Sequence, residues 1–321
     1  MRAGLLHAAL LHANAAEFLA GTLPYIRRGL ELREPVLVVE RADKIALLRR
    51  ELGEDAQLVR FARMEAIGAN PARLIAAWRD FLEEHAGGGT EVRGIGEPIW
   101  SSRPEDELAE CQVHESLMNV AFSGGRPWRL LCPYDSASLP KSVIDEARRS
   151  HAFVIERQVE LPSAAFRGRA VPAALFDGRL TAPPGDARGV SFATGGLREV
   201  RALVARECAA AGLDPESTVD LVAAVTEVAT NSLRHGGGGG HALTWHDAVS
   251  VLCEVRDRGR FASPLAGRER PRNLGSPAGL WLANQLCDLV QVRSYATGTV
   301  VRLTVRRERA RPVAGWAWAA V

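Results

Sequence analysis

Three polar residues spaced four apart carry the clearest chemical pattern in this sequence. Glu227, Asn231 and His235 lie in the segment EVATNSLRHG, whose apolar residues recur with the spacing of an amphipathic helix. Residues four apart on an α-helix differ by about 40° around its axis, so the three side chains form one stripe. An acid beside an amide suits a hydrated Mg²⁺ ion on a nucleotide, because Mg²⁺ prefers oxygen ligands and keeps several waters.

Three short motifs that contain glycine or aspartate follow this helix in order. An aspartate at the end of a strand can accept the exocyclic amine of adenine, and glycines let backbone N–H groups approach phosphates at a helix start. In phosphoryl transfer, the acid of the helix can orient or deprotonate the attacking group while the amide oxygen holds Mg²⁺. The motifs are Asp257-x-Gly259, Gly275-x-x-x-Gly279-Leu280 and Gly298-Thr299.

The elements that would position these residues are helices followed by strands. Asp214-Pro215 starts the helix of the polar stripe, because aspartate caps helix N-termini and proline favours the first helical position. The glycine run 236–240 ends that helix. Helices followed by antiparallel-looking strands predict an α+β layer. The other expected elements are helices at 197–210 and 279–287, strands at 249–255 and 301–305, and a long loop at 257–278.

The N-terminal half alternates short apolar runs with helical patterns, which predicts a parallel α/β sheet. No phosphate-binding G-x-x-x-x-G-K-[ST] segment occurs in it. Residues 160–190 are rich in proline and glycine and show no sustained periodicity, as is typical of a linker. The expected organisation is a first domain at 1–158, a linker at 159–188, a second domain at 189–307 and a tail at 308–321.

The composition is that of an ordinary globular protein without a general affinity for polyanions. Hydrophobic residues make up 47% of the 321 residues, and 40 basic residues balance 38 acidic ones to a net charge of +2. This balance argues against direct binding of nucleic acid. Five scattered cysteines fit free thiols in a reducing cytoplasm. We expect no signal peptide and no membrane span, hence a cytoplasmic protein.

The ordered motifs resemble the ATP-binding domain of the GHKL superfamily, and more closely its anti-sigma-factor serine kinase branch, over about residues 188–307. The resemblance implies an α+β sandwich that binds ATP and Mg²⁺. It implies Glu227 as the catalytic base, Asn231 as the Mg²⁺ ligand and Asp257 as the acid that reads adenine. Further nucleotide contacts are implied for Gly259, Gly275, Gly279, Leu280 and Thr299. The chain departs from the family in lacking the second small residue after Asp257-x-Gly259 and the Gly-x-Gly-Leu of the phosphate lid.

Residues 1 to about 158 resemble the MEDS sensory domain, named for methanogen and methylotroph sensors. The resemblance rests on GLELREPVLV from Gly29, GEPIW from Gly96, ECQVHE from Glu110 and CPYD from Cys132. It implies a RecA-like parallel α/β fold that receives a signal, with a small molecule as one candidate. A MEDS domain followed by this ATPase resembles the RsbA-type anti-sigma regulatory proteins. The implied partners are a sigma factor and a STAS-type anti-anti-sigma protein that is phosphorylated on serine. Relatives of this ATPase commonly dimerise, so a homodimer is an open alternative.

Two other functions stay open. His114-Glu115 resembles the phosphoacceptor of a histidine kinase, which would make the protein a sensor histidine kinase. The departures near Asp257 and Gly279 would instead fit a catalytically silent nucleotide-binding interaction module. A discriminating observation is whether phosphate appears on histidine, on serine of a partner, or on neither.

Two readings also stay open for the polar residues of the N-terminal half. Glu97, Trp100, His114 and Tyr134 could line a sensory pocket or could be satisfied core residues. Cys111-x-x-His114, with Cys132, could begin a metal site, although a buried polar cluster is the alternative. His235 fits a structural role at the end of its helix, where an imidazole suits the last carbonyls.

Overall fold

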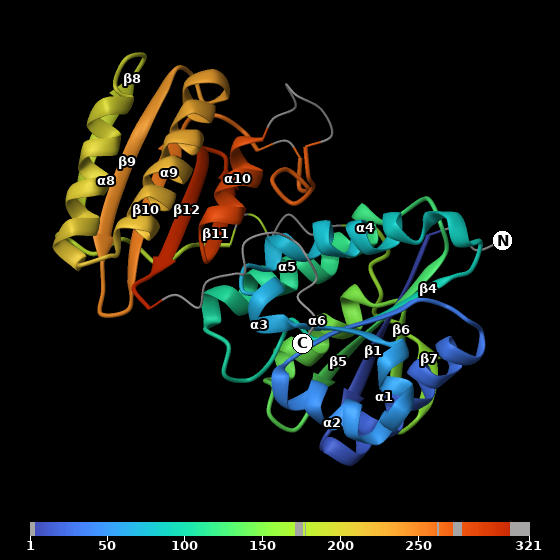
Figure 1. The fold of residues 1–321 in the computed structure, drawn as a ribbon. Helices are drawn as coiled ribbons and strands as arrows, with labels where there is room; N and C mark the ends of the chain where they lie inside the picture. The colour runs from blue at the N-terminus through green and yellow to red at the C-terminus, as the bar shows by residue number, and fades with distance from the viewer. Residues whose placement is uncertain (1–3, 171–175, 177, 262, 272–277, 309–321) are drawn as a thin grey trace. The chain divides into compact units, whose positions relative to one another are not determined.

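The computed structural model describes residues 4–170, 176, 178–261, 263–271 and 278–308. The described residues divide into two compact units, with the boundary between residues 171 and 172. Each unit has its own β-sheet and its own hydrophobic core. Figure 1 shows the elements of both units, coloured along the chain. Among the described residues, no helix combines the length and the apolar content that a bilayer crossing requires.

A seven-stranded sheet forms the centre of the first unit, in the order β3-β2-β4-β5-β1-β6-β7. Six strands run parallel, and β7 pairs antiparallel with β6 at one edge. The expected parallel α/β architecture is therefore confirmed. The strands are β1 (Leu5–His12), β2 (Val36–Glu40), β3 (Arg60–Arg63), β4 (Val92–Gly96), β5 (Trp128–Asp135), β6 (Phe153–Glu156) and β7 (Val159–Pro162).

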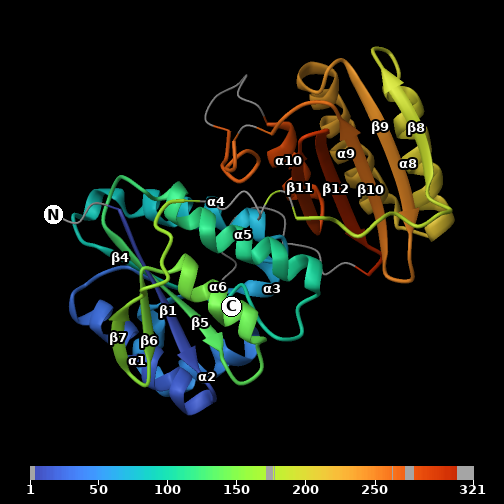
Figure 2. The ribbon, with the colours of Figure 1, turned by 180° about the vertical axis from the view of Figure 1, so that it is seen from behind.

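Helices cover both faces of this sheet. Side chains of α1 and α2, such as Phe18 and Ile45, pack with Val38 and other strand residues into one core. Helices α4, α5 and α6 lie on the opposite face (Figures 1 and 2). Burial on both faces explains why β2 is a continuous apolar run rather than an alternating one. The helices are α1 (Ala15–Glu31), α2 (Ala42–Leu52), α3 (Met64–Ile67), α4 (Leu74–Glu84), α5 (Glu105–Ala121) and α6 (Lys141–Ser150).

An antiparallel five-stranded sheet forms the second unit, in the order β11-β12-β10-β9-β8. Three helices pack on one of its faces, where alternate strand residues meet the apolar stripe of α9. This α+β layer was expected from the order of helices and strands. The elements are β8 (Arg188–Ala193), α8 (Leu197–Ala211), α9 (Pro215–His235), β9 (Gly239–His246), β10 (Ser250–Asp257), α10 (Gly279–Leu286), β11 (Leu289–Tyr295) and β12 (Gly298–Arg306).

The other face of the second sheet carries a buried ion pair and a crossing segment of chain. The Arg302 guanidinium contacts the Glu254 carboxylate, with a shortest distance of 2.5 Å, and lies over the Trp245 ring. Arg302 also donates a hydrogen bond to the Thr181 carbonyl at 2.6 Å, and Tyr295 donates one to the Gly178 carbonyl at 3.1 Å. These contacts hold residues 178–181 against β11 and β12.

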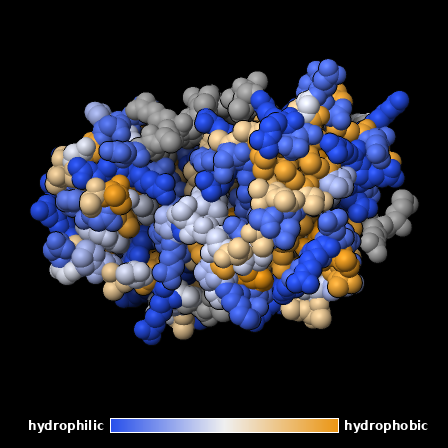
Figure 3. Space-filling view, turned by 90° about the horizontal axis from the view of Figure 1, so that it is seen from below, coloured by the Kyte–Doolittle hydropathy of each residue, from blue (hydrophilic) through white to orange (hydrophobic). Residues whose placement is uncertain are grey.

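The segment expected to link the domains is thus partly built into each unit. It begins with β7, which is paired in the first sheet, and residues 178–181 contact the second sheet. Val159 and Leu161 of β7 are among the exposed large hydrophobic residues, because β7 is an edge strand. On the face that Figure 3 displays, hydrophobic surface is interspersed with hydrophilic side chains.

Candidate functional site

Helix α9 places Glu227 and Asn231 beside one another, as the fourfold spacing predicts. The helix begins where its sequence indicates, because the Asp214 side chain accepts a hydrogen bond from the Ser217 N–H at 3.0 Å. Its apolar stripe is buried against the sheet and α8, which fixes the rotation of the helix. Glu227 and Asn231 are half-buried on a neighbouring stripe, and His235 is exposed in the last turn.

The start of α10 packs directly against these two side chains. A methyl group built on Gly279 would lie 2.7 Å from Glu227 Oε2 and 3.2 Å from Asn231 Nδ2. Any residue larger than glycine at position 279 would therefore require the Glu227 and Asn231 side chains to move. The structure thus brings together three candidate residues that lie up to 52 positions apart in the sequence.

Glu227 and Asn231 keep their polar atoms available at this contact. Within the described part of the chain, neither side chain forms a hydrogen bond or an ion pair with another residue. A carboxylate oxygen and an amide oxygen are ligand types that Mg²⁺ accepts, and the first N–H groups of a helix attract phosphate. The donor set at the α9–α10 contact therefore fits a magnesium-bound phosphate group.

Asp257, at the end of β10, is held by two donors. Ser232 Oγ donates to Asp257 Oδ2 at 2.6 Å, and the Gly259 N–H donates to Asp257 Oδ1 at 2.8 Å. Thr299 lies opposite Asp257 on β12 and donates to the Gly259 carbonyl at 2.9 Å. Asp257, Gly259 and Thr299 therefore form one connected group, with the carboxylate oriented by its neighbours.

Ser232 is a site residue that was not predicted from the sequence. It lies on the buried stripe of α9, whose other members are apolar apart from Ser217 in the first turn. A hydroxyl at a core position requires a hydrogen-bond partner, and here the nearest acceptor is Asp257 Oδ2, with the Val228 carbonyl further away at 3.3 Å. The signal that could have revealed it is a polar residue near the end of a stripe that is otherwise apolar beyond the first turn.

A pocket of about 460 Å³ lies next to Asp257. Its wall includes the glycine run and two basic side chains, which favour an anionic ligand. Gly236 forms part of this wall and packs closely against Asp257. A methyl group at Gly236 would lie 2.5 Å from Asp257 Cγ, so a larger residue would displace the carboxylate. Glu227, Asn231 and Gly279 do not line it, so it adjoins only the Asp257 end of the candidate site. The lining residues are Gly236, Gly237, Gly238, Gly239, Gly240, His241, Arg256, Asp257 and Arg258.

Of the two remaining residues of the glycine motif, Leu280 lies within the described residues and Gly275 does not. Leu280 is half-buried and packs against the core of the second unit. It also faces Gly267, where a methyl group would lie 2.7 Å from Leu280 Cγ, so it supports the loop after β10.

In the first unit, each of the four candidate sensory residues has a different immediate environment. Glu97 follows β4 and forms an ion pair with Lys44. Trp100 is half-buried and has the Arg103 guanidinium 4.4 Å from its ring centroid. Tyr134 is buried edge-on against the His151 ring, with the ring centroids 5.6 Å apart. His114 is buried in α5.

The carboxyl ends of β1, β2 and β4 carry a buried group of ionisable residues around Glu97. Burial, and then the nearby Glu97, raise the pKa of the Glu40 carboxyl well above its ordinary value. Burial also raises the pKa of Glu97, against the opposing effect of Lys44. Burial and Lys44 lower the pKa of His12 to about 4. At neutral pH an uncharged His12 therefore lies beside Lys44, whose Nζ is 3.4 Å from His12 Nε2.

Comparisons with known proteins agree with this division into two units. Residues 6–152 match the model of the MEDS family, described as "MEthanogen/methylotroph, DcmR Sensory domain". Residues 190–305 match the family model of the histidine kinase-like ATPase domain. No curated protein matches the chain.

Among solved structures, the chain is similar to the RsbU and RsbW domains of a Mycobacterium tuberculosis protein. The sequence identity is 23% and the TM-score is 0.28. The match covers 37% of this chain and 32% of that chain, so this chain spans about a third of the length of its structural relative. The assignment rests on the two family models: the chain joins a MEDS sensory domain to a histidine kinase-like ATPase domain.

Proposed function

We propose that this protein is a cytoplasmic anti-sigma regulator of the RsbA type. In this proposal the MEDS unit receives a signal, and the ATPase unit binds Mg-ATP and phosphorylates a serine of a STAS-type anti-anti-sigma protein. Phosphorylation of that protein leaves the ATPase unit available to hold a sigma factor. The observation that carries the proposal is the contact of Glu227 and Asn231 with the start of α10 at Gly279. The histidine kinase-like match supports ATP as the ligand, and the MEDS match supports a sensory input.

The residues of the ATPase unit would divide the recognition of Mg-ATP among them. Asn231 would hold Mg²⁺, which when bound neutralises negative charge on the phosphates. Asp257, oriented by Ser232 and Gly259, would accept the exocyclic amine of adenine. Thr299 would support this end of the site through its bond to Gly259, and the N-terminus of α10 would face the phosphates.

Glu227 would act as the general base. Its carboxylate would accept the proton of the attacking serine hydroxyl while the serine oxygen bonds to the γ-phosphorus and the bond to the ADP oxygen breaks. The half-buried position of Glu227 and the absence of a described partner leave its oxygens available for this proton.

Calorimetric titration with Mg-ATP tests the binding part of the proposal. We expect Asn231→Ala to weaken ATP binding by about tenfold or more, because the proposed amide-oxygen ligand of Mg²⁺ is lost. Thr230→Ala is the matched control, since among the described residues the Thr230 hydroxyl bonds only to the Thr226 carbonyl of the same helix. Equal affinity of wild type and Asn231→Ala would remove Asn231 from the site.

Phosphoryl transfer is tested separately, with radiolabelled ATP and a STAS-type protein captured from the native cell. We expect acid-stable label on the partner, and a loss of about 10²-fold or more in rate for Glu227→Gln with ATP binding retained. Acid-labile label that disappears in His114→Ala would support a histidine kinase instead, although His114 is only 2% exposed in α5. Nucleotide binding without any transfer would support a silent interaction module.

A further inference from the structure

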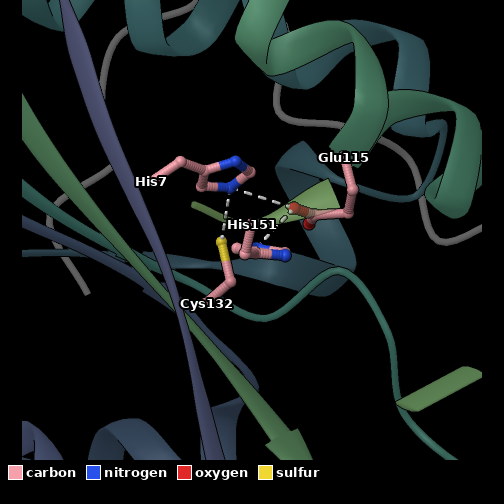
Figure 4. A group of neighbouring side chains, drawn as sticks. All are labelled: His7, Glu115, Cys132 and His151. Atoms are coloured by element: carbon pink, nitrogen blue, oxygen red, sulfur yellow. Dashed lines mark hydrogen bonds and ion pairs between the residues drawn. The ribbon is translucent and has the colours of Figure 1, made fainter. Parts of the chain in front are cut away.

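Four buried side chains from distant parts of the sequence converge in the first unit (Figure 4). His7 projects from β1 and Cys132 from the adjacent β5, while Glu115 reaches them from α5. His151 follows the last residue of α6. Each of the four is at most 2% exposed. None of them belongs to the candidate nucleotide site, so their convergence has no explanation in the proposed ATPase chemistry.

The spacing of their donor atoms is that of ligands around a metal ion. His7 Nε2 lies 3.3 Å from Cys132 Sγ and 3.1 Å from Glu115 Oε2, and His151 Nε2 lies 3.3 Å from the same Glu115 oxygen. All four donor atoms lie within 4.8 Å of one another. Tetrahedral zinc bonds of about 2.0–2.3 Å place neighbouring ligand atoms about 3.3–3.8 Å apart. Only small side-chain movements therefore separate the group from such a site.

The orientation of the rings favours a metal site over a catalytic Cys-His-Glu arrangement. A histidine that relays a proton uses one ring nitrogen toward the nucleophile and the other toward the acid. His7 instead directs the same Nε2 atom toward both Cys132 and Glu115. Among the described residues, His151 Nε2 and both Glu115 oxygens lack a hydrogen bond of normal geometry, although they are fully buried. Buried polar atoms that are directed at one point without well-aligned hydrogen bonds are expected where an ion would bind.

The second nitrogen of His151 is already fixed in the way that metal-binding histidines require. His151 Nδ1 lies 2.8 Å from the Ala147 carbonyl at the end of α6. A carbonyl can only accept, so Nδ1 carries the proton and Nε2 presents its lone pair toward Glu115 and Cys132. This bond to the backbone orients the imidazole before any ion arrives.

We propose that His7, Glu115, Cys132 and His151 bind one divalent ion of the zinc class. A thiolate with two imidazoles selects zinc-like transition ions over Mg²⁺ and Ca²⁺, which prefer oxygen ligands. Four protein ligands without an open position are typical of a structural rather than a catalytic zinc site. The ion would link α5 and the start of the α6–β6 connection to β1 and β5. Binding of the ion would thereby stabilise the MEDS unit.

Cobalt binding to the full chain, after metal removal with a chelator, tests the proposal. Co²⁺ replaces Zn²⁺ and reports tetrahedral geometry by its visible bands and a thiolate ligand by a near-ultraviolet charge-transfer band. We expect one Co²⁺ per chain, displacement by Zn²⁺, and a higher melting temperature with either ion. A folded, metal-free wild type that takes up no Co²⁺ or Zn²⁺ at stoichiometric concentration would overturn the proposal.

Two buried cysteines of the same unit provide a matched comparison. Cys132→Ser should lose the charge-transfer band and weaken binding at least tenfold. Cys111→Ser should keep the charge-transfer band and the wild-type Co²⁺ affinity, because the Cys111 thiol donates to the Pro98 carbonyl and is outside the group. Equal effects of the two substitutions would contradict the assignment. If Cys132→Ser does not fold, Glu115→Gln preserves the side-chain shape, and unchanged Co²⁺ affinity in that variant would count against the site equally.

Discussion

At the scale of single residues, the contact of Gly279 with Glu227 and Asn231 decides how the candidate nucleotide site is assembled. The backbone of α10 reaches these side chains only because residue 279 has no Cβ atom. A methyl group there would meet the free end of the Glu227 side chain, which can move, rather than rigid backbone. The expected effect of adding it is therefore a displaced Glu227 carboxylate, the proposed general base, within an intact fold.

Gly279→Ala should weaken Mg-ATP binding by about tenfold and lower the free energy of unfolding by only about 1–2 kcal/mol, as is common for local overpacking. Calorimetric titration and urea denaturation measure the two effects. Gly185→Ala is the control, because a methyl group at Gly185 would have no atom within 4 Å. Unchanged ATP affinity in Gly279→Ala would show that α10 does not form part of the nucleotide site.

The sequence could predict those residues whose relation is local and could not predict those that meet only in the folded chain. Helical spacing alone places Glu227 beside Asn231, because four residues make about one turn. The convergence of His7 with His151 joins residues 144 positions apart through the pairing of β1 with β5 and β6. No spacing rule encodes such a contact. A histidine in an apolar run is equally compatible with an ordinary buried residue.

At the scale of elements, the capped start of α9 determines where the polar stripe lies along the site. Asp214→Ala removes the side-chain acceptor of the Ser217 N–H. Loss of such a cap costs about 1 kcal/mol, so the melting temperature should fall by a few degrees. Glu227 lies three turns further along the helix, so ATP affinity at a temperature well below the transition should change less than twofold. Asp214→Asn serves as the control, since asparagine caps helices equally well. A large loss of affinity with unchanged stability would contradict this purely structural role.

The elements that could not be predicted are those with ambiguous composition. Strand β1 is rich in leucine and alanine, which favour helices, yet it lies buried between β5 and β6. Strand β9 begins within the glycine run, where intrinsic strand preference is weak. Both are stabilised by their neighbours in the sheet rather than by local preference. By contrast, the buried residues of α6 recur at the three- to four-residue spacing of an amphipathic helix, so its composition is not ambiguous: Val143, Ala147 and Ser150.

At the scale of the whole molecule, the two units bury their sheets in different ways. The parallel sheet has helices on both faces, whereas the antiparallel sheet has helices on one face and residues 178–181 along part of the other. Each unit has its own hydrophobic core. ATP should therefore raise the unfolding temperature of the second unit, and a zinc-class ion should raise that of the first. The two units could then be perturbed separately.

The pH dependence of unfolding provides a test of the buried ionisable group in the first unit. His12 is 3% exposed, and its pKa of about 4 in the folded state lies below the 6.5 expected when it is unfolded. Between pH 6.5 and 4 the unfolded state therefore binds more protons, so this contribution to stability is present above pH 6.5 and is lost as the pH falls toward 4. The full difference amounts to about 3 kcal/mol.

Replacing His12 by glutamine should remove this dependence. Between pH 7 and pH 4.5, the unfolding free energy of His12→Gln should fall by about 2 kcal/mol less than that of wild type, as measured by urea denaturation of the full chain. His235→Gln, at an exposed position of the second unit, should follow the wild-type dependence. The neighbours that set the His12 pKa are Lys44, which lowers it after burial, and Asp135 and Glu17, which raise it. Identical pH profiles for wild type and His12→Gln would mean that the pKa of His12 is the same in the folded and unfolded protein, which would contradict the lowered folded-state pKa.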